Sequence, residues 1–216
     1  MWIAHRGASA HAPENTVKAF KLAEQMGAHG IEMDVQVTRE GVPVVFHDQW
    51  LRRLTRFPGR LTAHTLVELR KIKLQGEGIP TLREALQHTR IPVFLEVKDP
   101  HGIKQILENA VPHKKRVTVI SFYPGVLAKA KKQGFKTGLL SLTGILGSGL
   151  AAKLKTDYLL VHGRFYRKGL TQAAEARGTK ILAWGVHTPK HGQKLLRSGV
   201  HGVVADFPVH LQTTQK

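Results

Sequence analysis

The sequence contains no cysteine, which excludes disulfides, thiolate metal sites and cysteine nucleophiles together. Any metal ion would have to be bound by oxygen or imidazole ligands. Acidic residues are scarce: the sequence has 15 Asp and Glu residues but 33 Lys and Arg residues, which gives a formal net charge of +18. No apolar run approaches the roughly 18 residues that a membrane-spanning helix needs. The N-terminus has no signal-peptide pattern either, so we expect a cytoplasmic protein.

The excess of positive charge favours anionic partners without naming one. The basic residues are spread in short groups such as Lys114–Arg116 and Lys129–Lys132, without the interleaved aromatic residues that stack on nucleic-acid bases. We therefore expect a solvated basic surface, no specific nucleic-acid partner and at most a weak contact with anionic membranes. An alternative of a different functional class is a protein without catalytic activity, whose former active site no longer works and whose positive charge binds nucleic acid.

Strand-like apolar runs alternate with amphipathic helical patterns along nearly the whole chain, which is typical of βα units and a parallel sheet. The runs predicted to be strands cover residues 2–5, 30–35, 92–98, 117–122, 136–141, 158–162, 180–186 and 202–206. Eight strands are the number that closes a (β/α)8 barrel. The predicted fold is therefore α/β, a single TIM-barrel domain over residues 1–216.

One segment breaks this rhythm. After Asp34 the chain reads VQVTREGVPVVFHD, two alternating apolar runs that predict a β-hairpin. A two-residue turn at Glu40 and Gly41 would pair Asp34 with His47. Residues 49–80 contain one modest helical stretch, residues 65–74, and are predicted to form an insertion, or lid, over the barrel mouth between the second strand and the second helix.

Acidic and basic side chains end two of the predicted strands. Side chains two residues apart on a strand share a face, so Glu32 and Asp34 point the same way, as do Glu96 and Lys98. Both pairs lie near the carboxyl ends of their strands, where TIM barrels have their active sites. Converging carboxylates need positive charge among them. That charge is either a divalent cation, with oxygen ligands favouring Mg²⁺, Ca²⁺ or Mn²⁺, or an ion network with Arg6 and Lys98.

Two of the 13 histidines differ from the rest because each closes an apolar run at the predicted mouth. His5 and His47 could act beside a metal as general base and general acid. Arg6 directly follows His5 in the same turn.

Two further pairs of residues are open to two interpretations. Pro13 is expected to begin a helix, so Glu14 and Asn15 either face the mouth from its first turn or serve as ordinary helix caps. Phe122 and Trp184 are either apolar walls of a pocket or aromatic residues of the core.

Ordered motifs along the chain resemble the glycerophosphodiester phosphodiesterase family: HRGASAHAPENT, GIEMDVQVTREGVPVVFHD, IPTLREAL, FLEVK, ISF, LAWGV and GVVADFP. The resemblance covers essentially the whole chain. It implies a TIM-barrel hydrolase acting on phosphoric diesters with a divalent metal. The implied substrates are glycerophosphodiesters such as glycerophosphocholine and glycerophosphoethanolamine, which would give sn-glycerol 3-phosphate and an alcohol.

The resemblance also implies roles by position. The residues implied are the metal ligands Glu32, Asp34 and Glu96, the catalytic His5 and His47, the phosphate-binding Arg6 and Lys98, the supporting Glu14 and Asn15, and the pocket residues Trp184 and Phe122. Segments 56–59 and 185–187 depart from the usual family motifs, and we expect these departures to reshape the mouth. A lysophospholipase D-like activity on lysophospholipids is an alternative, and an apolar groove at Leu51, Leu54 and Phe57 would favour it.

Overall fold

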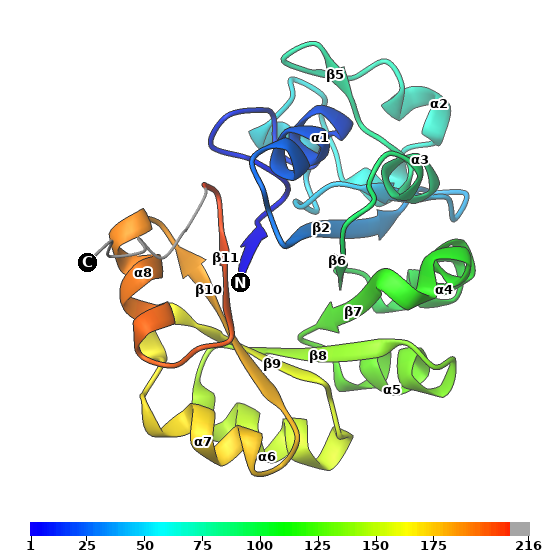
Figure 1. Cartoon of the computed structure of the whole chain (residues 1–216). Coiled ribbons are helices and arrows are strands. Elements are labelled where there is room, and N and C mark those ends of the chain that lie inside the picture. The colour runs from blue at the N-terminus through cyan, green and yellow to red at the C-terminus, as the bar shows by residue number, and fades with distance from the viewer. Residues whose placement is uncertain (208–216) are drawn as a thin grey trace.

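The computed structural model describes residues 1–207, apart from the side chains of residues 145 and 146. Eight parallel strands form a ring, in the order β1 (Trp2–Ala4), β2 (Gly30–Val37), β6 (Val93–Val97), β7 (Val117–Ser121), β8 (Lys136–Ser141), β9 (Tyr158–His162), β10 (Lys180–Val186) and β11 (Gly202–Ala205). Strand β1 pairs with both β2 and β11, which closes the ring (Figure 1). The predicted TIM barrel and its eight strands are confirmed.

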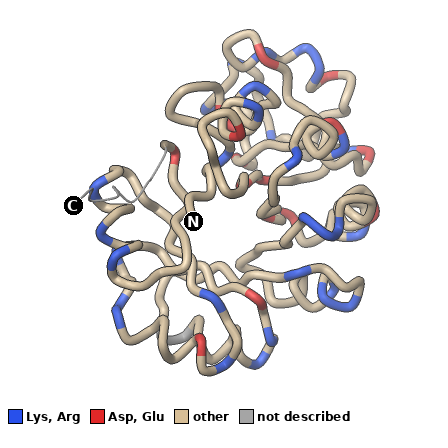
Figure 2. The backbone as a smooth tube through the Cα atoms, in the orientation of Figure 1, with Lys and Arg blue, Asp and Glu red and all other residues tan. Residues whose placement is uncertain are grey.

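Helices cover the outside of the ring (Figure 1). They are α1 (Val17–Gln25), α3 (Leu82–Gln87), α4 (Ile103–Ala110), α5 (Pro124–Lys132), α6 (Gly144–Leu154), α7 (Gly169–Glu175) and α8 (Pro189–Arg197), with short 3-10 helices η3 (Pro100–Gly102), η4 (Val111–Arg116) and η5 (Gly163–Phe165). Within residues 1–207, no helix has the length and apolarity that crossing a bilayer requires. Lys and Arg residues are spread along these outer elements (Figure 2).

The inside of the barrel is filled by an apolar cluster with side chains from seven of the eight strands. The cluster consists of Ile3, Phe94, Ile120, Leu140, Leu160, Leu182 and Val204. Strand β2 is the exception, because Glu32 pairs in register with the inward-facing Phe94 and therefore points inward as well. Strand β2 therefore places the carboxylate of Glu32 in the barrel interior, where the other strands place apolar side chains.

The hairpin after β2 forms, but its predicted register is wrong by one residue. Strand β3 (Pro43–Val45) pairs with β2 so that Val35 lies opposite Val45, and the amide of Phe46 donates to the carbonyl of Asp34. The loop contains three residues and ends on Gly41 with φ +83°, a conformation that glycine adopts without strain. Asp34 therefore lies opposite Phe46, not His47.

A bend after β3 still brings His47 to the barrel mouth. The side-chain nitrogen of Gln36 lies 2.8 to 3.2 Å from the carbonyl oxygens of residues 46, 47 and 48. These three contacts turn the backbone away from the ladder. The buried side-chain amide of Gln36 therefore fixes the backbone on both sides of His47.

The insertion between β3 and α3 contains η1 (Leu51–Arg53), η2 (Leu61–Ala63), α2 (Leu66–Leu69), β4 (Lys73–Leu74) and β5 (Glu77–Gly78). The helix predicted over residues 65–74 ends at Leu69, because Lys73–Leu74 pairs with Glu77–Gly78 as a short hairpin. Leu51 is fully buried in a separate apolar cluster of this insertion, and Leu54 and Phe57 pack against it. Leu54 and Phe57 are partly exposed and line a surface pocket together with charged side chains such as Arg53 and Lys71.

The helix expected to begin at Pro13 begins at Val17 instead. Thr16 is its N-cap, and the hydroxyl of Thr16 accepts a hydrogen bond from the amide of Ala19. Residues 13–15 are therefore free to form a turn that faces the mouth.

Candidate active site

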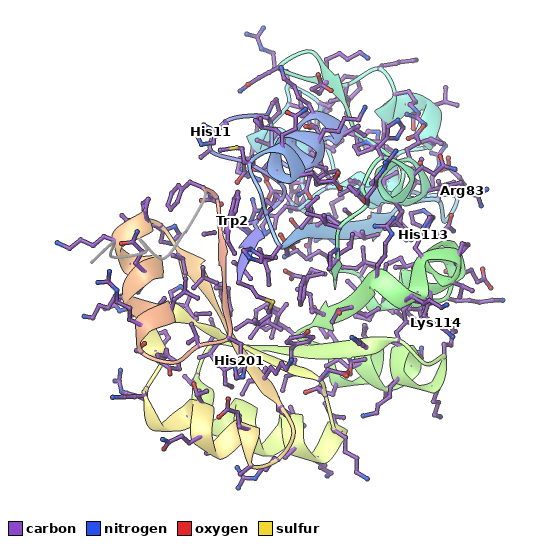
Figure 3. All side chains as sticks on the ribbon, viewed as in Figure 1. Trp2, His11, Arg83, His113, Lys114 and His201 are labelled. Carbon is purple, nitrogen blue, oxygen red and sulfur yellow. The ribbon has the colours of Figure 1, made fainter. Side chains whose placement is uncertain are left out.

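The ends of β1 and β11 place His5 and Asp206 next to each other. The two strands run in register, and the indole nitrogen of Trp2 donates to the carbonyl of Ala205 at 3.2 Å (Figure 3). His5 Nδ1 lies 2.6 Å from Asp206 Oδ1. Burial raises the pKa of Asp206, but the hydrogen bond and charge of His5 outweigh it and leave the pKa below its usual value. The ionised carboxylate of Asp206 can only accept a hydrogen bond, so Nδ1 of His5 carries the proton. The other ring nitrogen of His5, Nε2, lies 4.0 Å from Glu32 Oε2.

Three carboxylates meet inside the mouth. Glu32 and Asp34 come from β2 and Glu96 from β6, and one oxygen of each lies within 4.8 Å of the others. Glu32 and Asp34 are almost fully buried. Burial raises the pKa of Glu32 well above its usual value, and the negative charges of Asp34 and Glu96 raise it further. Burial and Asp34 likewise raise the pKa of Glu96.

Two cations lie against this cluster. Arg6 Nε is 3.3 Å from Asp34, and Lys98 Nζ is 3.1 Å from Asp34 and 2.7 Å from Glu96. Burial alone would raise the pKa of Asp34, but Lys98 and other nearby positive groups lower it to about 2. The ion network considered as an alternative to a metal is therefore present. It is incomplete, because Glu32 Oε1 is buried without a hydrogen-bond partner within residues 1–207.

The unpaired oxygen Oε1 of Glu32 is a first indication that the three carboxylates can bind a metal ion. An oxygen without a donor, facing two more carboxylates, needs a positive ligand to offset its desolvation. Three oxygen donors from carboxylates are ligands that hard divalent cations prefer. The cluster of Glu32, Asp34 and Glu96 therefore fits a divalent metal site.

Glu14 and Asn15 both face the site and neither caps a helix. Glu14 Oε1 accepts hydrogen bonds from Arg6 at 2.7 Å and from Arg53 at 2.6 Å. Asn15 has φ +57°, a left-handed conformation that asparagine tolerates. Its side-chain nitrogen donates to Asp34 at 2.8 Å, and its oxygen accepts the amide of Asp34 at 3.3 Å. Both residues thus fix the charged groups around them.

The second histidine has the same kind of carboxylate partner as the first. His47 Nδ1 lies 2.5 Å from Asp48 Oδ1, and Asp48 in turn accepts a hydrogen bond from Arg53. Burial lowers the pKa of His47; Asp34 opposes this effect, and Lys98 adds to it. His47 therefore favours the neutral imidazole, with Nε2 as its free atom.

A cavity of about 370 Å³ joins the two histidines, the two cations and two of the three carboxylates. On one side it is lined by His5, Arg6, Glu32, His47, Glu96 and Lys98, and on the other by Phe122 and Trp184 with aliphatic side chains of the barrel interior. The rings of Phe122 and Trp184 meet edge to face at 6.0 Å between centroids. Both aromatic residues are pocket walls, and the cavity therefore combines charged and apolar lining.

Sequence reasoning missed several residues of the site, including His162 and His187 in the cavity lining. Asp206 follows β11 as His5 follows β1, so the rule that found His5 could also have found Asp206. Asp48 directly follows His47 and could have been noted as its neighbour. No local signal marks Arg53, because its contacts with Asp48 and with Glu14 depend on how the insertion folds back onto the mouth.

Comparisons with known proteins agree on one family. Residues 5–210 match the model of the glycerophosphoryl diester phosphodiesterase family. A glycerophosphodiester phosphodiesterase of Caldanaerobacter subterraneus is 33% identical, over 95% of this chain and 93% of that protein. A putative glycerophosphodiester phosphodiesterase of Bacillus subtilis is also 33% identical, over 95% of this chain and 94% of its own.

A solved structure is similar over nearly the whole fold. An Oleispira antarctica phosphodiesterase in complex with the product sn-glycerol-3-phosphate superposes with a TM-score of 0.91 and 29% identity, covering 98% of this chain and 95% of that one. The chain therefore belongs to the glycerophosphoryl diester phosphodiesterase family.

Proposed function

We propose that this protein hydrolyses small glycerophosphodiesters, such as glycerophosphocholine and glycerophosphoethanolamine, to sn-glycerol 3-phosphate and an alcohol. The observation that carries the proposal is one cavity in which a carboxylate cluster meets two histidines, each paired with an aspartate. Family membership and the product bound to the Oleispira relative support the same substrate class.

In this proposal Glu32, Asp34 and Glu96 hold one divalent cation, Mg²⁺, Ca²⁺ or Mn²⁺. When bound, the cation would supply positive charge that offsets the charge on the phosphoryl oxygens and polarises the phosphorus centre. The raised pKa of Glu32 supports this assignment, because it reflects the free-energy cost of keeping these carboxylates ionised without such a charge.

Arg6 and Lys98 are proposed to bind the phosphate. Both are fixed before substrate arrives, Arg6 by Glu14 and Asp34, and Lys98 by Asp34 and Glu96. Fixed donors aimed at developing negative charge stabilise a transition state without reorganising during the reaction.

His5 and His47 are proposed to move the protons. Asp206 and Asp48 hold their Nδ1 atoms, which leaves Nε2 of each ring for proton transfer at the mouth. One histidine takes the proton of the substrate's glycerol 2-hydroxyl as its oxygen attacks phosphorus, and the other protonates the departing alcohol oxygen. Water then opens the resulting cyclic phosphate to give sn-glycerol 3-phosphate. General acid–base catalysis of this kind typically contributes about 10²- to 10⁴-fold per group.

Trp184 and Phe122 are proposed to pack against the carbon atoms of the glycerol group, since they form the apolar side of the cavity. Residues 49–80 are proposed to act as a lid on a single domain, 1–216. Arg53 supports this, because it links the insertion to Glu14 in the loop after β1. Leu51 is buried inside the insertion, and the surface pocket lined by Leu54 and Phe57 contains none of the proposed catalytic groups, so these residues give no support to a lysophospholipase D-like activity.

The proposal is tested by incubating the purified protein with glycerophosphocholine and a divalent metal and measuring sn-glycerol 3-phosphate with a coupled dehydrogenase. We expect production of sn-glycerol 3-phosphate that scales with protein concentration. A folded protein that releases none from either glycerophosphodiester, with each of the three metals supplied in turn, would contradict the proposal.

A further inference from the structure

The exposed aromatic side chains are gathered at one end of the molecule. Of the fourteen Phe, Tyr and Trp residues, four are exposed: Trp50, Phe122, Tyr123 and Phe165. Trp50 follows β3, Phe122 and Tyr123 follow β7, and Phe165 follows β9 in η5. All four therefore lie in loops around the barrel mouth.

Three of these residues lie outside the catalytic cavity. Trp50 and Tyr123 line an adjoining groove beside His47, Glu96 and Lys98, and Phe165 lines neither of the two. Their side chains remain 54, 47 and 43% exposed, although each has a large apolar surface. Exposed apolar groups clustered around an opening typically mark an interaction surface.

Positive charge accompanies the same residues. The guanidinium of Arg60 lies over the ring of Trp50, 5.2 Å from its centroid. Phe165 is flanked by the exposed cations Arg164, Arg167 and Lys168. None of these four cations forms an ion pair with a carboxylate in the part of the chain that the structure describes.

The segments that carry these cations also lack negative charge. No Asp or Glu occurs between residues 49 and 67 or between residues 158 and 174. The rim around Trp50 and Phe165 therefore combines aromatic rings with unneutralised positive charge.

We propose that the barrel mouth docks onto an anionic lipid bilayer, with Trp50, Tyr123 and Phe165 entering the headgroup region. Aromatic side chains favour the membrane interface, and each nearby Lys or Arg is attracted by anionic headgroups. The cations at positions 60, 164, 167 and 168 and the net charge of +18 complement such a surface. In this orientation the catalytic cavity would face the lipid surface.

A bilayer fits these residues better than a nucleic acid does. Base stacking uses aromatic residues aligned along a groove that follows a strand. Here Trp50 and Tyr123 share one groove, but Phe165 lies in the loop after β9, beyond β8. Anchors on separate sides of one opening suit a broad, flat partner.

The test measures binding of the full chain to lipid vesicles by co-sedimentation and needs no turnover, so its outcome is separate from that of the proposed reaction. We expect binding to vesicles that contain phosphatidylglycerol and none to pure phosphatidylcholine. Added salt should weaken the binding, since charges are screened over about 10 Å at 0.1 M ionic strength.

Rim variants define the surface. Arg167→Gln and Lys168→Gln should each weaken vesicle binding about fivefold, and the double variant about 30-fold. Trp50→Ala and Phe165→Ala should each weaken it severalfold, also at high salt, because their contribution is apolar. Thermal unfolding of each variant confirms that the fold is retained.

Matched control variants lie at the opposite end of the barrel, on η4 before β7. Val111→Ala and Lys115→Gln remove an exposed apolar group and an exposed cation next to Lys114, which Figure 3 labels. Their vesicle binding should equal that of the wild type. The proposal is overturned if the wild type does not bind phosphatidylglycerol vesicles or if the controls lose as much binding as the rim variants. Tighter binding of an oligonucleotide, weakened by the same rim substitutions, would also overturn it.

Discussion

Replacing Asp206 by asparagine removes the charge that holds His5 while keeping the size of the side chain. The carboxylate lies 2.6 Å from Nδ1, and its side chain is one-third exposed. Hydrogen bonds to charged groups contribute about 1.5–3 kcal/mol, equivalent to roughly 10- to 150-fold in rate if the loss falls entirely on the transition state. Solvent screening favours the lower part of that range. We expect Asp206→Asn to lower kcat by about 10- to 50-fold and to change KM little.

A double-mutant cycle separates a role in positioning His5 from a general structural role. Four proteins are assayed for release of sn-glycerol 3-phosphate: the wild type, Asp206→Asn, His5→Ala and the double variant. If Asp206 acts through His5, the double variant should be about as slow as His5→Ala alone. Effects that multiply in the double variant would refute this reasoning.

Asp157 provides a matched control for the loss of a carboxylate. Its Oδ2 accepts the amide of Thr137 at 2.8 Å at the other end of the barrel. Asp157→Asn should lower the melting temperature and leave kcat unchanged. A fall in kcat as large as that of Asp206→Asn would show that the assay responds to stability and not to the position of His5.

The remaining predictions concern the second histidine, the carboxylate cluster and the turn after β1. His47→Ala should lower kcat by about 10²- to 10⁴-fold with an unchanged melting temperature, and a wild-type rate would remove His47 from the mechanism. Glu32→Gln should weaken metal binding in calorimetry, and an unchanged titration would count against Glu32 as a ligand. Because its pKa is raised in the fold, Glu32 destabilises the metal-free protein when ionised, so Glu32→Gln should raise the melting temperature at pH 7 but not below about pH 4. Gly7→Ala should lower the free energy of unfolding in urea by about 2–4 kcal/mol, since φ is +80° and the new Cβ would lie 2.7 Å from the backbone of Ala19; a loss below about 0.5 kcal/mol would contradict this.

The barrel was predictable because buried parallel strands and amphipathic helices alternate so regularly in this sequence. Much of the site was predictable for a related reason: polar residues that end apolar strands, such as His5, Glu32 and Glu96, all reach the same mouth once the strands are parallel.

The hairpin register was not predictable in the same way. Turns of two and three residues around Gly41 both satisfy the local sequence, and only packing against the rest of the fold selects between them. His47 reaches the site through the contacts of Gln36 with the backbone that follows β3, which no local pattern reveals.

Long-range contacts explain the other omissions. Asp206 is separated from His5 by 201 residues, and Arg53 from Glu14 by 39 residues. Exposure is equally hidden in the sequence, since Trp2 is fully buried whereas Trp50 is the most exposed aromatic residue of the rim. The composition therefore predicts the net charge, but it does not predict which aromatic side chains are exposed around the barrel mouth.

The central claim is that a metal held by Glu32, Asp34 and Glu96 is required for cleavage of a glycerophosphodiester. The most direct test is release of sn-glycerol 3-phosphate from glycerophosphocholine by the purified protein, first treated with EDTA and then supplied with Mg²⁺, Ca²⁺ or Mn²⁺. The account predicts that activity is lost on chelation and returns with at least one of these ions. Full activity in the presence of EDTA, in protein shown by elemental analysis to be free of metal, would contradict it.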